Sequence, residues 1–202
     1  MKLRNCATAR LRHRATAPPR DCATAMWIFG YGSIIWKPGF EYVERRAGYV
    51  EGWARRFFQH STDHRGVPGN PGRVVTLLQR EGSRCWGVAY RVADCEREYI
   101  VDQLDHRERG GYSRHEVEVA SGDGLVADSA VMYVAGRQND NWAGPARLEH
   151  MATQIVSAEG PSGDNVEYVF ELAEALRTIG AEDSHVFELE RAVRRILNDS
   201  DD

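Results

Sequence analysis

Long apolar runs are missing from this sequence of 202 residues. A membrane-spanning helix needs about 20 consecutive apolar residues, and no segment of the chain approaches that length. The sequence also lacks the alternation of strand and helix patterns that marks Rossmann and P-loop folds. These absences argue against a helical membrane protein and against a doubly wound nucleotide-binding enzyme.

Cysteine is scarce, and its spacing suggests no bridges. The four cysteines (Cys6, Cys22, Cys85 and Cys95) form no Cys-x-x-Cys pair, and two of them lie in an unusual N-terminal segment. This pattern excludes a disulfide framework and a zinc ligand set, and it favours a reducing compartment. We therefore expect a cytoplasmic protein.

Basic residues are concentrated at the N-terminus. Residues 1–25 contain six Lys and Arg and one Asp, although the whole chain carries a formal charge of −4. Residues 26–202 are therefore acidic, which argues against nonspecific nucleic-acid binding because that binding depends on neutralising phosphates with Lys and Arg. The hydrophobic content of 42% and the five Trp residues are typical of one folded globular domain.

The segment 1–25 differs from the rest of the chain. Cys-Ala-Thr-Ala occurs at 6–9 and again at 22–25, with Pro18-Pro19 between the two copies. The segment lacks the apolar stretch of a secretory signal, and its low complexity predicts a disordered basic extension. An organelle transit peptide, or a natural start at Met26, stays open as an alternative. Residues 26–202 form the predicted folded domain.

Apolar patterning predicts strands in the first part of the domain and helices in the last part. The expected strands begin at 27–29 and continue at 42–50, 53–59, 73–79, 85–91, 113–119 and 129–135. The expected helices cover 95–105, 145–157, 165–179 and the residues after Ser184, with Pro145 in a first turn. This order predicts an α+β fold with a mainly antiparallel sheet or small barrel.

The turn Gly30-Tyr31-Gly32-Ser33 follows the first strand and is the first candidate site. Its two glycines allow close approach of a ligand, so that successive backbone N–H groups can face a carboxylate or an oxyanion. No Gly-Lys-Ser/Thr sequence and no third Gly follow, which excludes phosphate-loop and dinucleotide fingerprints. A purely structural turn remains the alternative.

A second candidate is the charged segment 105–112. Glu108 lies among basic neighbours and directly before Gly110-Gly111, an arrangement suited to an acid/base group on a mobile segment. The alternative is a helix that ends at Gly110 and leaves Glu108 in solvent.

The loop at 61–69 is the third candidate. Arg65, or Arg73 just beyond the loop, can bind a carboxylate with two hydrogen bonds, although an ordinary capped turn explains the loop equally well. His60 and His64 have the spacing of a metal pair, but the Gly and Pro residues oppose a helix and no third ligand is evident. We expect no metal here. Tyr168, on an amphipathic helix pattern, is expected in the core.

Taken together, these segments resemble the ChaC-type, glutathione-specific γ-glutamylcyclotransferases over residues 26–197. The matching segments are Phe-Gly-Tyr-Gly-Ser-Ile-Ile-Trp (29–36), Ser-Thr-Asp-His-Arg-Gly-Val-Pro-Gly (61–69), Pro-Gly-Arg-Val-Val-Thr-Leu (71–77), Trp-Gly-Val-Ala-Tyr-Arg (86–91), Arg-Glu-Arg-Gly-Gly-Tyr (107–112) and Gly-Pro-Ser-Gly-Asp-Asn-Val-Glu-Tyr (160–168). Six matches in the family's order are far more specific than any one of them. The segment 1–25 has no counterpart in the family.

The resemblance implies a γ-glutamylcyclotransferase-like fold, in which helices pack around a small β-barrel. It implies an enzyme of the lyase class that cleaves glutathione to 5-oxoproline and Cys-Gly without a cofactor or a metal. Glu108 falls on the family's catalytic glutamate. The residues that fall on its substrate-binding loop are Gly30, Tyr31, Gly32, Ser33, Ile34 and Ile35. Ile34 replaces the commoner Leu, and Arg109 replaces the commoner Lys.

We add Arg65 and Tyr112 as expected substrate-binding residues. Two other readings stay open: a cyclotransferase for other γ-glutamyl amino acids or amines, and a module that binds γ-glutamyl compounds without turnover. The sequence makes no prediction about the oligomeric state.

Overall fold

The computed structural model describes residues 26–107 and 111–199, so Glu108 and the segment 1–25 lie outside the described residues. The strands are β1 (Met26–Gly30), β2 (Glu44–Ser61), β3 (Gly72–Val92), β4 (Tyr112–Ser121), β5 (Gly124–Ala135), β6 (Glu159–Gly160) and β7 (Gly163–Asp164). The helices are α1 (Arg97–Arg107), α2 (Leu148–Ser157), α3 (Asn165–Thr178) and α4 (Ser184–Asp199), with short 3-10 turns η1 (Ser33–Ile35) and η2 (Asp94–Glu96).

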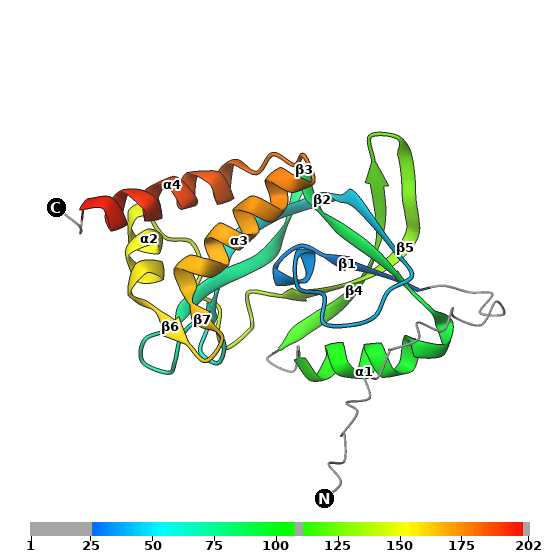
Figure 1. Ribbon diagram of the computed structural model, residues 1–202, viewed down its shortest axis with the longest axis horizontal. Helices are drawn as coiled ribbons and strands as arrows, with labels where there is room; N and C mark the ends of the chain where they lie inside the picture. Colours follow the sequence, from blue (N-terminus) through cyan, green and yellow to red (C-terminus); the bar gives the residue numbers. More distant parts are fainter. Residues whose placement is uncertain (1–25, 108–110, 200–202) are drawn as a thin grey trace, which may run out of the picture.

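The first five strands close into a barrel in the order β1-β3-β2-β4-β5. β1 and β5 pair in parallel, whereas the other neighbouring strands pair antiparallel. Helices α2, α3 and α4 lie together on one side of the barrel, and α1 lies apart from them (Figure 1). This arrangement confirms the predicted α+β fold with a small, mostly antiparallel barrel.

Two long strands replace four predicted short ones. The predicted strands 42–50 and 53–59 are both parts of β2, and 73–79 and 85–91 are both parts of β3. The β2–β3 pairing shifts register between Glu51 and Trp53, where Gly52 has a positive φ of 77°. The prediction of a break was wrong because glycine here allows an irregularity within a continuous strand rather than ending it.

The start of α2 was also predicted wrongly. Pro145 precedes the helix, which begins at Leu148 after an extended Arg147. The backbone N–H groups of Ala143 and Gly144 donate to the carbonyl of Phe58, at 2.8 and 3.1 Å. Because this segment is bound to the edge of β2, the chain cannot turn into a helix until it has passed Pro145.

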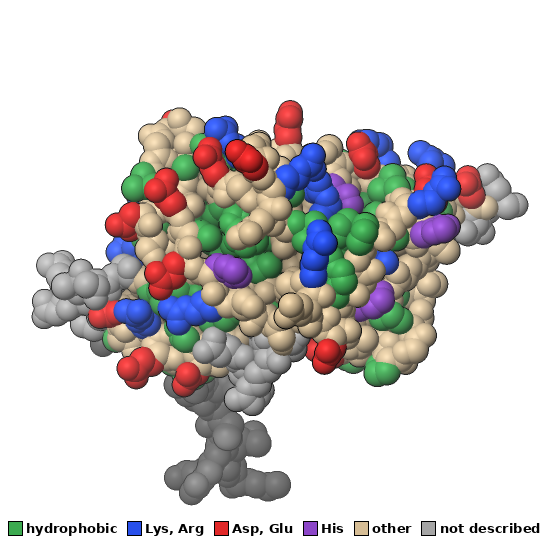
Figure 2. Space-filling model, turned by 180° about the vertical axis from the view of Figure 1, so that it is seen from behind, with side chains coloured by type: hydrophobic (Ala, Val, Ile, Leu, Met, Phe, Trp, Pro, Cys, Tyr) green, Lys and Arg blue, Asp and Glu red, His purple; other side chains and the backbone are tan. Residues whose placement is uncertain are grey.

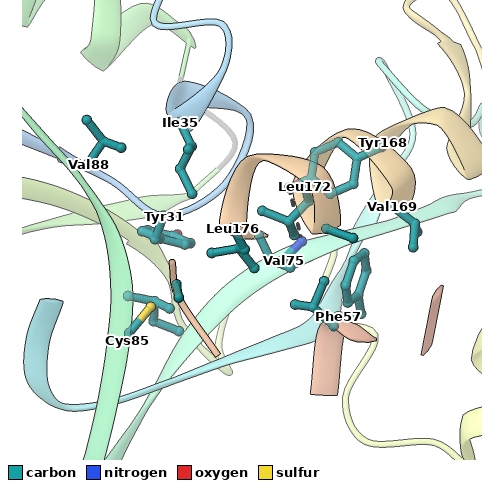
Figure 3. Packing of buried hydrophobic residues seen from close by; sticks show 14 of the residues in the cluster. Tyr31, Ile35, Phe57, Val75, Cys85, Val88, Tyr168, Val169, Leu172 and Leu176 are labelled. Atoms are coloured by element: carbon teal, nitrogen blue, oxygen red, sulfur yellow. Dashed lines mark hydrogen bonds between the residues drawn. The ribbon is translucent and has the colours of Figure 1, made fainter. Parts of the chain in front are cut away.

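The main core lies between the barrel and the helical layer. Along α3, Tyr168, Leu172 and Leu176 follow at four-residue spacing, Val169 lies three residues before Leu172, and all four are buried. Figure 3 shows these side chains lying close to those of the strands, including Phe57. A smaller cluster joins α1 to β1 and the neighbouring strands. The helical layer thus holds one side of the β2–β3 ribbon rigidly.

Candidate active site

A cavity of about 370 Å³ opens where the turn after β1, the end of β2 and the start of β4 meet. Of the eight predicted substrate-binding residues, six line this cavity: Tyr31, Gly32, Ser33, Ile34, Arg65 and Tyr112. Gly30 and Ile35 are buried behind it and do not line it. The structure therefore brings three segments that are distant in sequence to one hollow.

The carbonyl of Tyr31 is held from the core side of the turn. Arg55, which is 1% exposed, donates from Nε to this oxygen at 2.8 Å, and its Nη1 lies 2.9 Å from Asp183 Oδ2. In a trans peptide the next N–H points opposite to the carbonyl. The N–H of Gly32 is consequently directed away from Arg55.

Other carbonyls of the turn are also hydrogen-bonded to the protein. Gly32 O accepts from Ile35 N at 2.9 Å, and the hydroxyl of Tyr90 lies 2.9 and 2.8 Å from the carbonyl oxygens of Ile34 and Ile35. Burial raises the pKa of Tyr90 to about 12, which keeps this hydroxyl protonated as a donor. In the described part of the chain, the N–H groups of Gly32 and Ile34 have no acceptor. Two such donors in one turn suit a carboxylate or an oxyanion.

Close packing explains the two glycines of the turn. A Cβ on Gly30 would lie 2.5 Å from Ile34 Cγ2, which is a clash. A Cβ on Gly32 would lie 3.0 Å from the hydroxyl oxygen of Tyr168 and 3.1 Å from Val75 Cγ2. A side chain at Gly30 would therefore force the turn to shift, and one at Gly32 would push on Tyr168 and Val75.

The two arginines proposed as carboxylate ligands have different surroundings. Arg73 is buried, and its Nη1 donates to the carbonyls of Phe57 and Gly144 at 2.9 and 3.1 Å. Arg65 lines the cavity, donates from Nη1 to Asp164 O at 2.9 Å, and pairs with the carboxylate of Glu167. Arg73 is therefore a structural group, and Arg65 is the arginine available to the cavity.

Histidines line the same wall of the cavity. Burial, followed by the charge of Arg73, lowers the pKa of His60, so its imidazole is neutral at pH 7. Nδ1 of His64 lies 3.2 Å from Ser162 Oγ. Within residues 26–107 and 111–199, no group of three His, Cys, Asp or Glu side chains is arranged to hold a metal ion.

A comparison with known protein families shows which family this chain belongs to. The family model described as ChaC-like protein matches residues 26–196. The chain belongs to the ChaC-like family. It is 44% identical over 187 residues to gamma-glutamylcyclotransferase 2-3 of Arabidopsis thaliana, covering 88% of this chain and 93% of that protein. It is 43% identical over 178 residues to glutathione-specific gamma-glutamylcyclotransferase 1 of Homo sapiens, covering 86% of this chain and 80% of that protein.

A solved structure also resembles this ChaC-like chain. The crystal structure of a yeast gamma-glutamylcyclotransferase specific to glutathione superposes with a TM-score of 0.79 at 29% identity. The match covers 85% of this chain and 96% of the yeast chain. The barrel and its helical layer are therefore those of the glutathione-specific cyclotransferase structure.

The outer surface of the ChaC-like domain carries mixed charge. Figure 2 shows acidic and basic side chains interspersed on one face, rather than a single broad basic area. None of the helices in the described ranges is long and apolar enough to cross a membrane.

Two polar side chains outside the predicted substrate-binding set also line the ChaC-like cavity: those of Gln59 and Tyr168. Tyr168 was expected in the core rather than at a site, and it is buried; it also lines the cavity, with its ring 5.5 Å from that of Trp36 in an edge-on contact. Gln59 is 2% exposed and belongs to the alternating series of buried positions Arg55, Phe57, Gln59 and Ser61 on β2. A signal was present, because a polar residue at an inward strand position needs a partner or a function.

Proposed function

We propose that this protein cleaves glutathione to 5-oxoproline and Cys-Gly, as the names of its curated relatives state for glutathione-specific cyclotransferases. The observation that carries the proposal is the cavity, in which the glycine turn and Arg65 face the same hollow. In the reaction the α-amine of the γ-glutamyl group attacks its own γ-carbonyl carbon. A five-membered lactam forms, the γ-amide C–N bond breaks, and the cysteinyl nitrogen leaves as an amine.

Ring closure needs proximity more than chemical machinery. Nucleophile and electrophile belong to one molecule, and effective molarities for well-oriented intramolecular reactions reach about 10⁵–10⁸ M. A cavity that holds the glutamyl chain in a bent conformation therefore supplies much of the rate enhancement. The remaining barriers are the proton on the α-ammonium group and the poor leaving ability of the nitrogen.

Glu108 is the proposed acid/base. Its carboxylate takes a proton from the α-ammonium group and later gives it to the leaving nitrogen, a contribution of about 10²–10⁴-fold. Support comes from its position in sequence, after α1 and four residues before Tyr112, which lines the cavity.

The turn after β1 is the proposed site for the γ-carbonyl oxygen. The N–H groups of Gly32 and Ile34 are donors that are fixed before substrate arrives, because carbonyls of the turn are bound to Arg55 and Tyr90. Donors of this kind stabilise the tetrahedral oxyanion by roughly 2.7–4 kcal/mol each in known enzymes.

Arg65 is the proposed partner of the glycine carboxylate of glutathione. Its side chain is 12% exposed at the cavity and is already oriented by Asp164 O and Glu167. A guanidinium group that is fixed in this way loses little entropy on binding a carboxylate with two hydrogen bonds. Tyr112 is proposed to position the substrate from the opposite wall.

The direct test incubates the purified protein with glutathione in the presence of a metal chelator and follows release of 5-oxoproline and Cys-Gly. We expect both products in equal amounts. A comparison with γ-glutamyl-alanine and γ-glutamyl-lysine separates glutathione specificity from a broader cyclotransferase. Binding of glutathione without any release of 5-oxoproline would instead identify a binding module.

We further propose a cytoplasmic location. Thiols are kept reduced there, which suits Cys85 and Cys95, both free thiols in this structure. Localising the full chain and a variant that starts at Met26 would test this, and mitochondrial or plastid targeting by residues 1–25 would contradict it.

A further inference from the structure

Gln59 has a buried oxygen without a hydrogen-bond donor. Among the buried side-chain polar atoms of the described residues, Oε1 of Gln59 is the one that lacks a partner. The side chain is 2% exposed, and the residue lines the cavity. Buried acceptors without a donor are rare in folded proteins, because a buried polar atom that makes no hydrogen bond lowers stability. This oxygen therefore requires an explanation.

Neighbouring groups fix which end of the Gln59 amide is the oxygen. The backbone N–H of Asn141 donates to Asn139 Oδ1 at 2.8 Å, so this atom is an acceptor. The Nε2 of Gln59 donates to the same Oδ1 at 2.8 Å. If the oxygen and nitrogen of the Gln59 amide were exchanged, two acceptor oxygens, Gln59 Oε1 and Asn139 Oδ1, would face each other. Oε1 must therefore face away from Asn139.

Asn139 lies between the Gln59 amide and Gly111, the residue before β4. A Cβ on Gly111 would come within 2.8 Å of Asn139 Nδ2, and the next residue, Tyr112, lines the cavity. We propose that Gln59 Oε1 accepts a hydrogen bond from the α-amino nitrogen of the substrate. This inference rests on the proposed function, in which that nitrogen transfers its proton to Glu108.

A neutral acceptor suits this nitrogen better than a carboxylate would. An amide oxygen accepts from both –NH₃⁺ and –NH₂, so Gln59 holds the nitrogen before and after Glu108 removes its proton. A second carboxylate at the nitrogen would stabilise the ammonium form and oppose deprotonation. Gln59 itself transfers no proton. It binds the nucleophile and leaves the lone pair free to attack the γ-carbonyl carbon.

The oxygen is shielded as well as unpaired. Its exposed area is below 1 Å², so substrate reaches it only when the side chains around it shift. Side-chain rearrangements of this size are common on binding, and a hydrogen bond formed away from water is stronger than an exposed one.

The test measures preference for the amine, separately from turnover. Calorimetry gives the Kd of glutathione and of glutaryl-Cys-Gly, which lacks the α-amino group, for the full-length E108Q variant and for E108Q combined with Gln59→Met. We expect Gln59→Met to reduce the preference for glutathione by roughly 10- to 100-fold, since a hydrogen bond to a charged group is lost. An unchanged preference would overturn the proposal, even if both ligands bind more weakly. It would mean that Gln59 Oε1 accepts its hydrogen bond from water or from the γ-amide N–H and not from the α-amino group.

Two further variants separate this role from a structural one. Thr76→Val also removes a buried polar atom, which donates to Ala135 O at 2.7 Å outside the cavity lining, and it should leave the amine preference unchanged.

Gln59→Glu keeps an acceptor and adds a negative charge that raises the pKa of the bound ammonium. In a plot of kcat against pH, the rise that follows deprotonation of this ammonium group should therefore move to higher pH. No movement in a folded Gln59→Glu enzyme would count against the proposal. If the wild-type protein releases no 5-oxoproline, the proposed function fails separately.

Discussion

Two neighbouring parts of the buried face of β2 differ in chemistry although they belong to one strand. Arg55 and Phe57 lie at the helical layer, where the guanidinium group has an ion pair and two carbonyl partners and the ring is fully buried. Gln59 and Ser61 line the cavity, where one amide oxygen has no donor. In the first part every buried polar group is bound to the protein, whereas in the cavity part Ser61 Oγ accepts from Arg65 N and Oε1 of Gln59 has no partner within the described residues.

This division predicts that stability and catalysis respond to different substitutions. The buried charge of Arg55 is offset by Asp183 and by the carbonyls of Tyr31 and Trp86. Buried charges are tolerated only with such compensation, and the same bonds orient the turn at the cavity. A cavity variant that unfolds the protein, or an apolar core variant in α3 that removes activity from folded protein, would break the comparison.

The largest effect is expected from Glu108→Gln. The substitution keeps size and hydrogen bonding but removes the base, so release of 5-oxoproline should fall by about 10²–10⁴-fold. The melting temperature should stay close to that of the wild type. Near-normal turnover by the folded variant would end the assignment of Glu108.

In the helical layer we expect a large effect on stability and none on substrate binding. Leu172 is fully buried in α3, and Leu172→Ala should lower the free energy of unfolding by about 2–5 kcal/mol in urea titrations. KM of the folded fraction should be unchanged. Leu125→Ala is the matched control, because Leu125 is 58% exposed and the variant should stay within about 0.5 kcal/mol.

Gly32→Val should damage the cavity by displacing its donors. The new side chain meets the Tyr168 hydroxyl and Val75, so the turn has to move, and a shift of about 1 Å can cost 10²-fold in kcat/KM. Steady-state kinetics with glutathione measures the effect. At Gly122 a new Cβ meets nothing within 4 Å, so Gly122→Val should retain normal kinetics. Equal losses in both variants would contradict the proposed role of the turn.

The smallest effect concerns the pH dependence of stability at the helical layer. His185 accepts from Phe57 N at 3.1 Å, and burial lowers its pKa to about 4 from 6.5. As pH falls below 6.5 the unfolded chain binds a proton that the folded chain does not, so stability is lost between about pH 6.5 and 4. From pH 7.5 to 5 this amounts to roughly 2 kcal/mol.

Urea titrations of the wild type and of His185→Gln at the two pH values measure this contribution. Glutamine retains an acceptor for Phe57 N but does not titrate in this range. The variant should therefore lose about 2 kcal/mol less than the wild type on acidification. Equal losses would show that His185 is not the group that titrates.

Local patterns sufficed for much of the fold. The helices α3 and α4, each with a clear apolar face, lie where periodicity predicted them, and α1, β1 and β4 lie within a few residues of their predicted bounds, whereas β5 begins five residues before the predicted strand. The continuity of β2 through Gly52 was not predictable, since a glycine in a strand can equally mark a turn or an irregularity. The delayed start of α2 depends on hydrogen bonds from Ala143 and Gly144 to a residue 85 or more positions earlier.

For the candidate site, the sequence determined which chemical groups are present: a glycine turn, an arginine loop and a carboxylate before Gly110-Gly111. Only the tertiary structure decided which groups share a cavity. The fold buries Arg73 as a structural residue, places Arg65 at the cavity, and adds Gln59 and Tyr168 to the cavity lining. The physical reason is that burial and hydrogen-bond partners come from residues far apart in the chain, so no local pattern records them.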